Sequence, residues 1–221
     1  MKDTGKPASA PWQYAGLCIA LLGIPLVVAL SGWLAPVRTP GSVLARELSI
    51  FLLAVVLLWI VHRGERLAFA SIGMAPQRVP AMAGWTALSL LGLGIAIVAG
   101  MGLIQALGLR FGGGGSATPL PAWATLLVVL RAGIVEEIFY RGFAMSRIET
   151  ISGSRMLAFA FPLLAFAGFH WKQGPGGVVL ALLMGAVLAL VFQRTRRLWP
   201  CILAHLLVDL VPNVLIPLLQ D

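Results

Sequence analysis

Two adjacent carboxylates, Glu136 and Glu137, lie inside a strongly apolar stretch of the sequence, LRAGIVEEIFYRGF. An ionised side chain at the centre of a bilayer costs about 2.5–3.5 kcal/mol on insertion scales, so intramembrane carboxylates indicate functional sites. Glu137 and Arg141 are spaced i, i+4 with the glutamate first, the favoured order for an ion pair on a helix. Because neighbouring residues point about 100° apart on an α-helix, this pair leaves Glu136 without a partner. We therefore predict that Glu136 is catalytic and that Glu137 and Arg141 are structural.

Two histidines in apolar stretches could face Glu136. His170 lies seventeen residues after Gly153, and Glu136 lies seventeen residues before it. With the turn of an antiparallel helical hairpin at Gly153, equal offsets place both side chains at the same depth. His205 and Asp209 are spaced i, i+4, so they share a helix face on which the carboxylate can orient the imidazole. The set predicts a site where a glutamate activates water and imidazoles stabilise an oxyanion.

Each of these polar groups also has a purely structural interpretation. The two glutamates could join helices through ion pairs alone. His170 could be an interfacial residue, because Trp171 and Lys172 follow it directly. His205 and Asp209 could form a polar clasp between helices.

The elements that position these residues are predicted to be transmembrane helices. Of the 221 residues, 59% are hydrophobic and 11% are charged, whereas soluble domains are about 45–50% apolar and about 25% charged. The apolar runs are continuous rather than alternating, which indicates helices rather than a barrel. We predict an all-α, polytopic transmembrane helical bundle of about seven spans, with an eighth as the alternative, at roughly 13–36, 48–62, 81–108, 121–148, 155–171, 175–193 and 198–219.

The distribution of charge predicts how the chain lies in a membrane. The net charge of +8 comes from basic residues in the short connections between apolar runs, so we exclude nucleic acid as a partner. Ten Lys and Arg residues fall on one side and four on the other, which favours a cytoplasmic N-terminus. We expect a multi-pass integral protein of the bacterial inner (plasma) membrane. Cys18 and Cys201 lie in apolar runs without a CxxC partner and predict no thiolate metal site.

Three short motifs occur in order on separate predicted spans. They are Glu-Glu-x-x-x-Arg from Glu136, Phe-x-x-x-His from Phe166 to His170, and His-x-x-x-Asp from His205 to Asp209. The ordered set resembles the CAAX prenyl endopeptidase and bacteriocin-processing family, also called the CPBP or Abi family of intramembrane endopeptidases. The resemblance covers about residues 120–215. The last motif of that family more often ends in Asn, so Asp209 adds a charge that its relatives usually lack.

The resemblance implies an endopeptidase that cleaves near the C-terminus or in the membrane-proximal part of a peptide or protein substrate, with membrane lipids as its surroundings. The first glutamate would activate the water, with both histidines and Asp209 as its partners. Glu137, Arg141 and Phe166 would support them. We divide the chain into N-terminal helices without a recognised motif, 1–119, and a catalytic helical core, 120–221.

A metal has also been proposed for this family, and Glu136, His170 and His205 would leave zinc one open position. We expect no cofactor and favour a glutamate mechanism over a metalloprotease, because the chain lacks HExxH and metal-binding thiolates. Two functions of other classes stay open. One is a non-catalytic membrane binding or immunity protein, and the other is a proton-coupled transporter.

Overall fold

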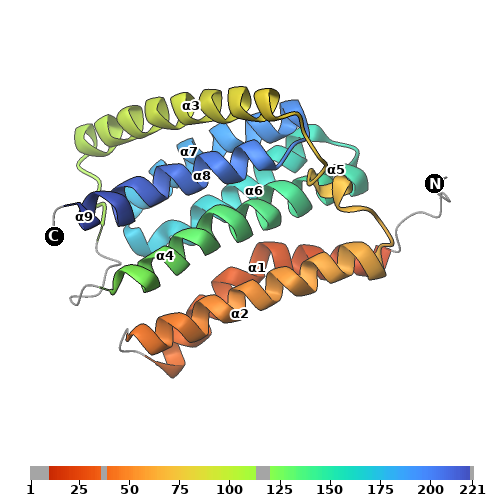
Figure 1. The fold of residues 1–221 in the computed structure, drawn as a ribbon, viewed down its shortest axis with the longest axis horizontal. Helices are drawn as coiled ribbons and strands as arrows, with labels where there is room; N and C mark the ends of the chain where they lie inside the picture. Colours follow the sequence, from red (N-terminus) through yellow and green to blue (C-terminus); the bar gives the residue numbers. More distant parts are fainter. Residues whose placement is uncertain (1–9, 36–38, 113–119, 220–221) are drawn as a thin grey trace.

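The computed structural model describes residues 10–35, 39–112 and 120–219, and within these ranges the protein consists of helices joined by short connections, with no strand. Figure 1 shows the helices lying roughly parallel or antiparallel along one direction. The predicted all-α class is confirmed for this part of the chain. The helices are α1 (Ala10–Leu34), α2 (Pro40–Trp59), α3 (Val79–Ala106), α4 (Ala122–Arg131), α5 (Ser146–Ser152), α6 (Arg155–Phe169), α7 (Pro175–Thr195), α8 (Trp199–Leu210) and α9 (Ile216–Leu218).

Short helical segments of other types extend or join these helices. Three are π-helical: η1 continues α2, η3 joins α4 to α5, and η5 joins α8 to α9. Two are 3-10 turns: η2 precedes α3, and η4 follows α6. Their bounds are Ile60–Gly64 (η1), Phe69–Ile72 (η2), Ala132–Met145 (η3), His170–Gln173 (η4) and Val211–Leu215 (η5).

Five helical stretches of the described residues are long and apolar enough to cross a membrane. They are α1, α2 with η1, α3, α7, and α8 through α9. The chain is therefore an integral membrane protein. Two predicted spans do not meet these criteria, because 121–148 carries several charges and α6 has only 15 residues. A total of seven spans stays a prediction, and so does the cytoplasmic N-terminus, which lies outside the described residues.

The turns around the predicted hairpin form for local reasons. Gly153 ends α5 in the left-handed region at φ 67°, where glycine has no steric penalty. The Ser154 hydroxyl then caps α6 by accepting from the Leu157 backbone N–H at 3.2 Å. The predicted turn between these two helices is confirmed.

The N-terminal helices pack on both sides of the motif-bearing helices. α3 contacts α7 and α8, whereas α1 contacts η3 and α2 contacts α4. Figure 1 shows α3 along one side of the bundle and the α1–α2 pair along the other. The division of the chain at residue 120 remains a prediction.

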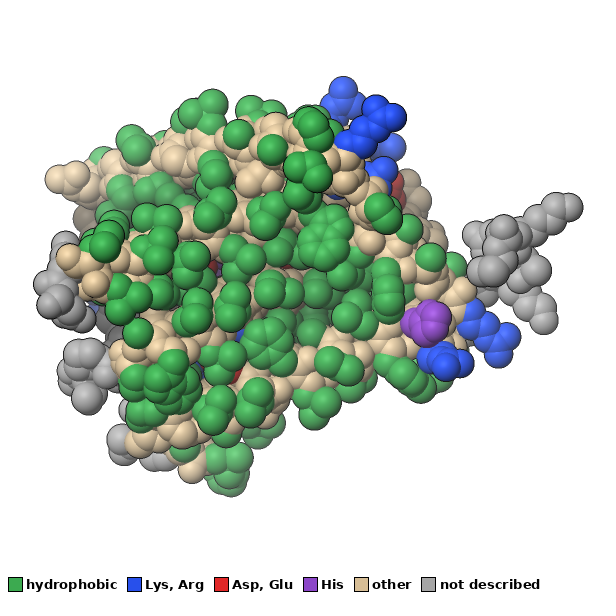
Figure 2. Space-filling model, in the orientation of Figure 1, with side chains coloured by type: hydrophobic (Ala, Val, Ile, Leu, Met, Phe, Trp, Pro, Cys, Tyr) green, Lys and Arg blue, Asp and Glu red, His purple; other side chains and the backbone are tan. Residues whose placement is uncertain are grey.

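The protein has a mainly apolar surface, and its buried charged side chains are paired, as expected for a protein in a bilayer. Figure 2 shows hydrophobic side chains over most of the visible face, with Lys and Arg gathered at the end where α5 lies. Inside, the charged side chains are paired, since an isolated buried charge would be costly. At the α5 end, Arg147 donates from Nε to Glu65 Oε1 at 2.8 Å and from Nη2 to Glu65 Oε2 at 2.7 Å.

Candidate active site

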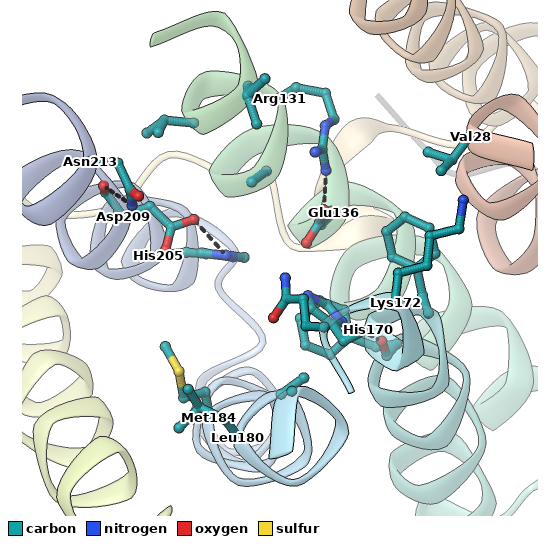
Figure 3. Close-up of a pocket in the computed structure, with 18 of the residues that line it drawn as sticks. Val28, Arg131, Glu136, His170, Lys172, Leu180, Met184, His205, Asp209 and Asn213 are labelled. Atoms are coloured by element: carbon teal, nitrogen blue, oxygen red, sulfur yellow. Dashed lines mark hydrogen bonds and ion pairs between the residues drawn. The ribbon is translucent and has the colours of Figure 1, made fainter. Parts of the chain in front are cut away.

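A cavity of about 960 Å³ lies between the helices and contains all four predicted catalytic residues. Glu136 comes from η3 and His170 from η4, and α8 supplies both His205 and Asp209. Figure 3 shows Glu136, His170 and His205 pointing toward the same space. The fold therefore brings together side chains that are up to 73 positions apart in the sequence.

The two glutamates lie in a π-helical segment rather than in an α-helix. η3 extends from Ala132 to Met145, and its i→i+5 hydrogen bonds make it wider than an α-helix. π-Helical turns occur frequently at functional sites. This geometry changes which residues along the chain can meet, so the α-helical assumption made from the sequence is wrong for this segment.

Glu137 binds two partners from one carboxylate oxygen. Its Oε1 accepts from Arg141 Nη1 at 2.8 Å, which is the predicted i, i+4 pair. The same oxygen also accepts from His205 Nδ1 at 2.8 Å. Arg141 is held further by the Gly185 carbonyl oxygen at 3.1 Å, and its guanidinium lies 4.4 Å from the centre of the Phe166 ring. Glu137, Arg141 and Phe166 thus form one buried support behind His205.

Glu136 is not free of charged partners, and that part of the prediction is wrong. Arg131 donates from Nη1 to Glu136 Oε1, and both side chains are buried. Arg131 also donates from Nε to Glu47 Oε2 at 2.8 Å. The candidate base is therefore one of two carboxylates that share a single guanidinium.

His205 lies between two carboxylates. Its Nδ1 faces Glu137 Oε1 at 2.8 Å, and its Nε2 faces Asp209 Oδ2 at 3.4 Å. A carboxylate only accepts hydrogen bonds, so the ring satisfies both contacts when it carries a proton on each nitrogen. The predicted contact between Asp209 and His205 is present, and the longer of the two contacts lies at Nε2.

His170 has a fixed tautomer. Its Nδ1 lies 2.8 Å from the Phe166 carbonyl oxygen, which can only accept, so Nδ1 carries the proton. The ring centre lies 4.8 Å from that of Phe166 and 5.7 Å from that of Phe169. This leaves Nε2 as the nitrogen that can act on a bound molecule.

Residues 118–211 match the model of a family described as type II CAAX prenyl endopeptidase Rce1-like. Over these residues the chain is similar to that family. The family resemblance drawn from the three motifs is confirmed, and the match supports a membrane endopeptidase of the CAAX-protease type. No curated protein and no solved structure gives a match to the chain.

The Rce1-like segment contains every residue of the predicted site, but the structure adds two residues that the sequence interpretation missed. Arg131 lies five residues before Glu136, a spacing that does not bring side chains together on an α-helix. Glu47 lies in α2, outside the matched segment, and the predicted span there began at residue 48. A carboxylate followed directly by an apolar run was the one available signal for Glu47.

A zinc site made by Glu136, His170 and His205 does not fit the geometry of these side chains. Across residues 10–35, 39–112 and 120–219, no three His, Cys, Asp or Glu side chains are grouped closely enough to hold a metal ion. Glu136 is ion-paired with Arg131, and a His205 ring that donates from both nitrogens has no lone pair for a metal.

Proposed function

We propose that the protein is an intramembrane endopeptidase of the glutamate type that hydrolyses a peptide bond near the C-terminus or in the membrane-proximal part of its substrate. One observation carries this proposal. Glu136, His170 and His205 come from three separate elements of an Rce1-like segment and line one cavity. This provides a base and two imidazoles around a space large enough for a peptide.

Water would be activated between Glu136 and His170. The carboxylate takes a proton from the water while the lone pair of His170 Nε2 holds its second hydrogen. The water oxygen forms a bond to the scissile carbonyl carbon, and the negative charge moves to the carbonyl oxygen. The protonated Glu136 then gives its proton to the amide nitrogen as the C–N bond breaks.

His205 is the candidate donor to the developing oxyanion. Its Nδ1 is held by Glu137 at 2.8 Å, whereas its Nε2 contact to Asp209 is long at 3.4 Å. Nε2–H can therefore turn its hydrogen bond from Asp209 to the oxyanion without losing the Glu137 contact. Preorganised donors of this kind contribute about 2.7–4 kcal/mol to transition-state stabilisation in other proteases.

The cavity walls favour a membrane-associated substrate. Val28 from α1, with Leu180 and Met184 from α7, lines the cavity opposite or beside the polar residues. The helices around the cavity also carry exposed leucines and other large apolar side chains on their outer faces. These features favour a substrate that a lipid or an apolar segment holds in the bilayer.

The direct test is to identify new protein C-termini made in cells with the parent protein and in cells with Glu136→Gln. Purified parent protein is then incubated with the peptides found, in water enriched in ¹⁸O. We expect cleavage products that carry one ¹⁸O in the new carboxylate, because water is the nucleophile. Identical C-termini in both cells would contradict an endopeptidase and favour a binding protein or a transporter.

Metal removal tests the glutamate mechanism separately. We expect the active purified enzyme to keep its rate after exchange into a strong chelator, because Glu136 and His205, two of the three candidate ligands, are engaged in ion pairs. Elemental analysis on the same sample should give far less than one zinc per chain. About one zinc per chain, lost together with activity, would show that the mechanism is wrong.

A further inference from the structure

Glu47 is a fully buried carboxylate that the proposed mechanism does not use. It has no exposed surface, and it does not line the cavity that contains Glu136. Its Oε2 accepts from Arg131 Nε at 2.8 Å, and its Oε1 accepts from Arg46 Nε at 2.7 Å. These contacts form a row of four alternating charges that ends at the candidate base. Its members are Arg46, Glu47, Arg131 and Glu136.

This row of charges forms because Glu47 on α2 and Arg131 on α4 lie at a similar depth in the bundle. Figure 1 shows α2 and α4 starting at the same end of the bundle. Glu47 lies seven residues after the start of α2 at Pro40, and Arg131 lies nine residues after the start of α4 at Ala122. With a rise of about 1.5 Å per residue, the two side chains enter the bundle to a similar depth.

Stability alone does not explain a carboxylate at this position. Removing two charges from water costs about as much as their attraction returns, so well-packed apolar residues often replace a buried ion pair without loss. α2 is otherwise rich in leucine, valine and alanine along the same stretch. We therefore look for the role of Glu47 in the site, which its partner Arg131 contacts.

Glu47 changes what Arg131 does to Glu136. A guanidinium with a single carboxylate partner would hold that carboxylate strongly in its ionised form and make it a poor proton acceptor. Here two carboxylates share the guanidinium through different nitrogens, Nε and Nη1, which also fixes its planar orientation. When Glu136 takes a proton, Arg131 still has Glu47 as a charged partner, so its guanidinium is not left without a carboxylate.

We propose that Glu47 is a positioning residue for the reaction, acting through Arg131 to orient Glu136 and to keep it able to take a proton. This inference rests on the proposed function, because it assigns Glu47 to the same proton transfer. It also assigns part of the site to α2, outside the Rce1-like segment.

The test is the cleavage rate of Glu47→Gln, measured as kcat and KM on a peptide that the parent cleaves. Glutamine keeps the shape and an oxygen acceptor for Arg131 Nε but removes the charge. We expect kcat to fall by about 10-fold with KM within about twofold, which is the lower end of the loss known for removing the hydrogen-bond partner of a metal ligand. Glu47→Asp, which keeps the charge, should recover most of the rate.

Glu65→Gln is the matched control. Glu65 is also a buried carboxylate paired with an arginine, Arg147, but it lies at the α5 end and outside the cavity of Glu136. Both substitutions should lower thermal stability in detergent, and only Glu47→Gln should lower kcat. An equal loss of kcat in both variants would overturn the inference, because the effect would then follow stability.

A second variant keeps the inference testable if Glu47→Gln does not fold. Arg131→Lys retains a positive charge but cannot bridge two carboxylates with a planar fork, so kcat should fall while KM is retained. If both single variants fold, the double variant should be no slower than the slower single one, because the residues act as a unit.

Three further results would overturn the inference. They are a parent-like kcat for Glu47→Gln and Arg131→Lys, a loss expressed only in KM, or fully additive losses in the double variant. If the parent cleaves the peptide and Glu47→Gln has the same kcat, this inference is wrong and the proposed function still stands. A parent without any cleavage activity removes both.

Discussion

Replacing Glu136 by glutamine is expected to lower kcat for peptide cleavage by about 10²–10⁴-fold, the usual loss when a general base is removed. The neutral amide has nearly the same shape but cannot take a proton from water. The variant should stay folded, because Arg131 keeps its ion pair with Glu47 at 2.8 Å. The measurement is cleavage of a defined peptide by purified protein, with thermal unfolding in detergent recorded on the same sample.

Glu149→Gln is the control for this experiment. Glu149 is a carboxylate thirteen residues further along the same continuous helical stretch, where it pairs with Arg196 outside the cavity. The hydrogen bond from Arg196 is the main cause that lowers the pKa of Glu149. This variant should cleave at the parent rate. Near-parent cleavage by Glu136→Gln would instead show that Glu136 is not the base.

Replacing Arg141 by alanine is expected to destabilise the protein by about 3–5 kcal/mol, because it leaves a buried carboxylate without its charged partner. Arg141 is fully buried and binds Glu137, the Gly185 carbonyl oxygen and the face of Phe166. Activity should fall as well, since Glu137 also holds His205 at 2.8 Å. The free energy of unfolding is measured in a mild detergent to which increasing amounts of a denaturing detergent are added.

Arg155→Ala provides the comparison for Arg141. The Arg155 side chain is 74% exposed and lies 3.4 Å from Glu149, a surface ion pair of the kind worth about 0–1 kcal/mol. Its loss should leave both stability and cleavage close to the parent values. If Arg141→Ala were as stable as the parent but inactive, Arg141 would act on the substrate rather than on Glu137.

Local spacing is the part of the site that could be predicted from the sequence. The Glu137–Arg141 and His205–Asp209 contacts both lie at i, i+4, where geometry within one helix determines the neighbours. The turn at Gly153 could also be predicted, because glycine readily takes the left-handed conformation that ends α5. These features need no knowledge of the rest of the fold.

The missed features depend on distant contacts or on a helix type without a sequence signal. Arg131 meets Glu136 five residues away, where the chain changes from α- to π-helix. Glu47 meets Arg131 across 84 positions, which only the packing of α2 on α4 establishes. The second contact of Glu137, with His205, likewise comes from packing of α8 against η3.

The charged stretch from α4 to α5 has a consequence for how the protein is made. It is long enough to cross a membrane but too charged to count as a membrane-crossing helix, since it carries Arg131, Glu136, Glu137 and Arg141. One of its charge partners, Glu47, is synthesised earlier, whereas His205 is synthesised later. Glu136 and Glu137 pair with Arg131 and Arg141 inside the stretch itself, whereas the further contacts to Glu47 and His205 join it to α2 and α8. The full set of contacts can therefore be completed only after α8 has been synthesised, so the order of translation makes it a late step of assembly.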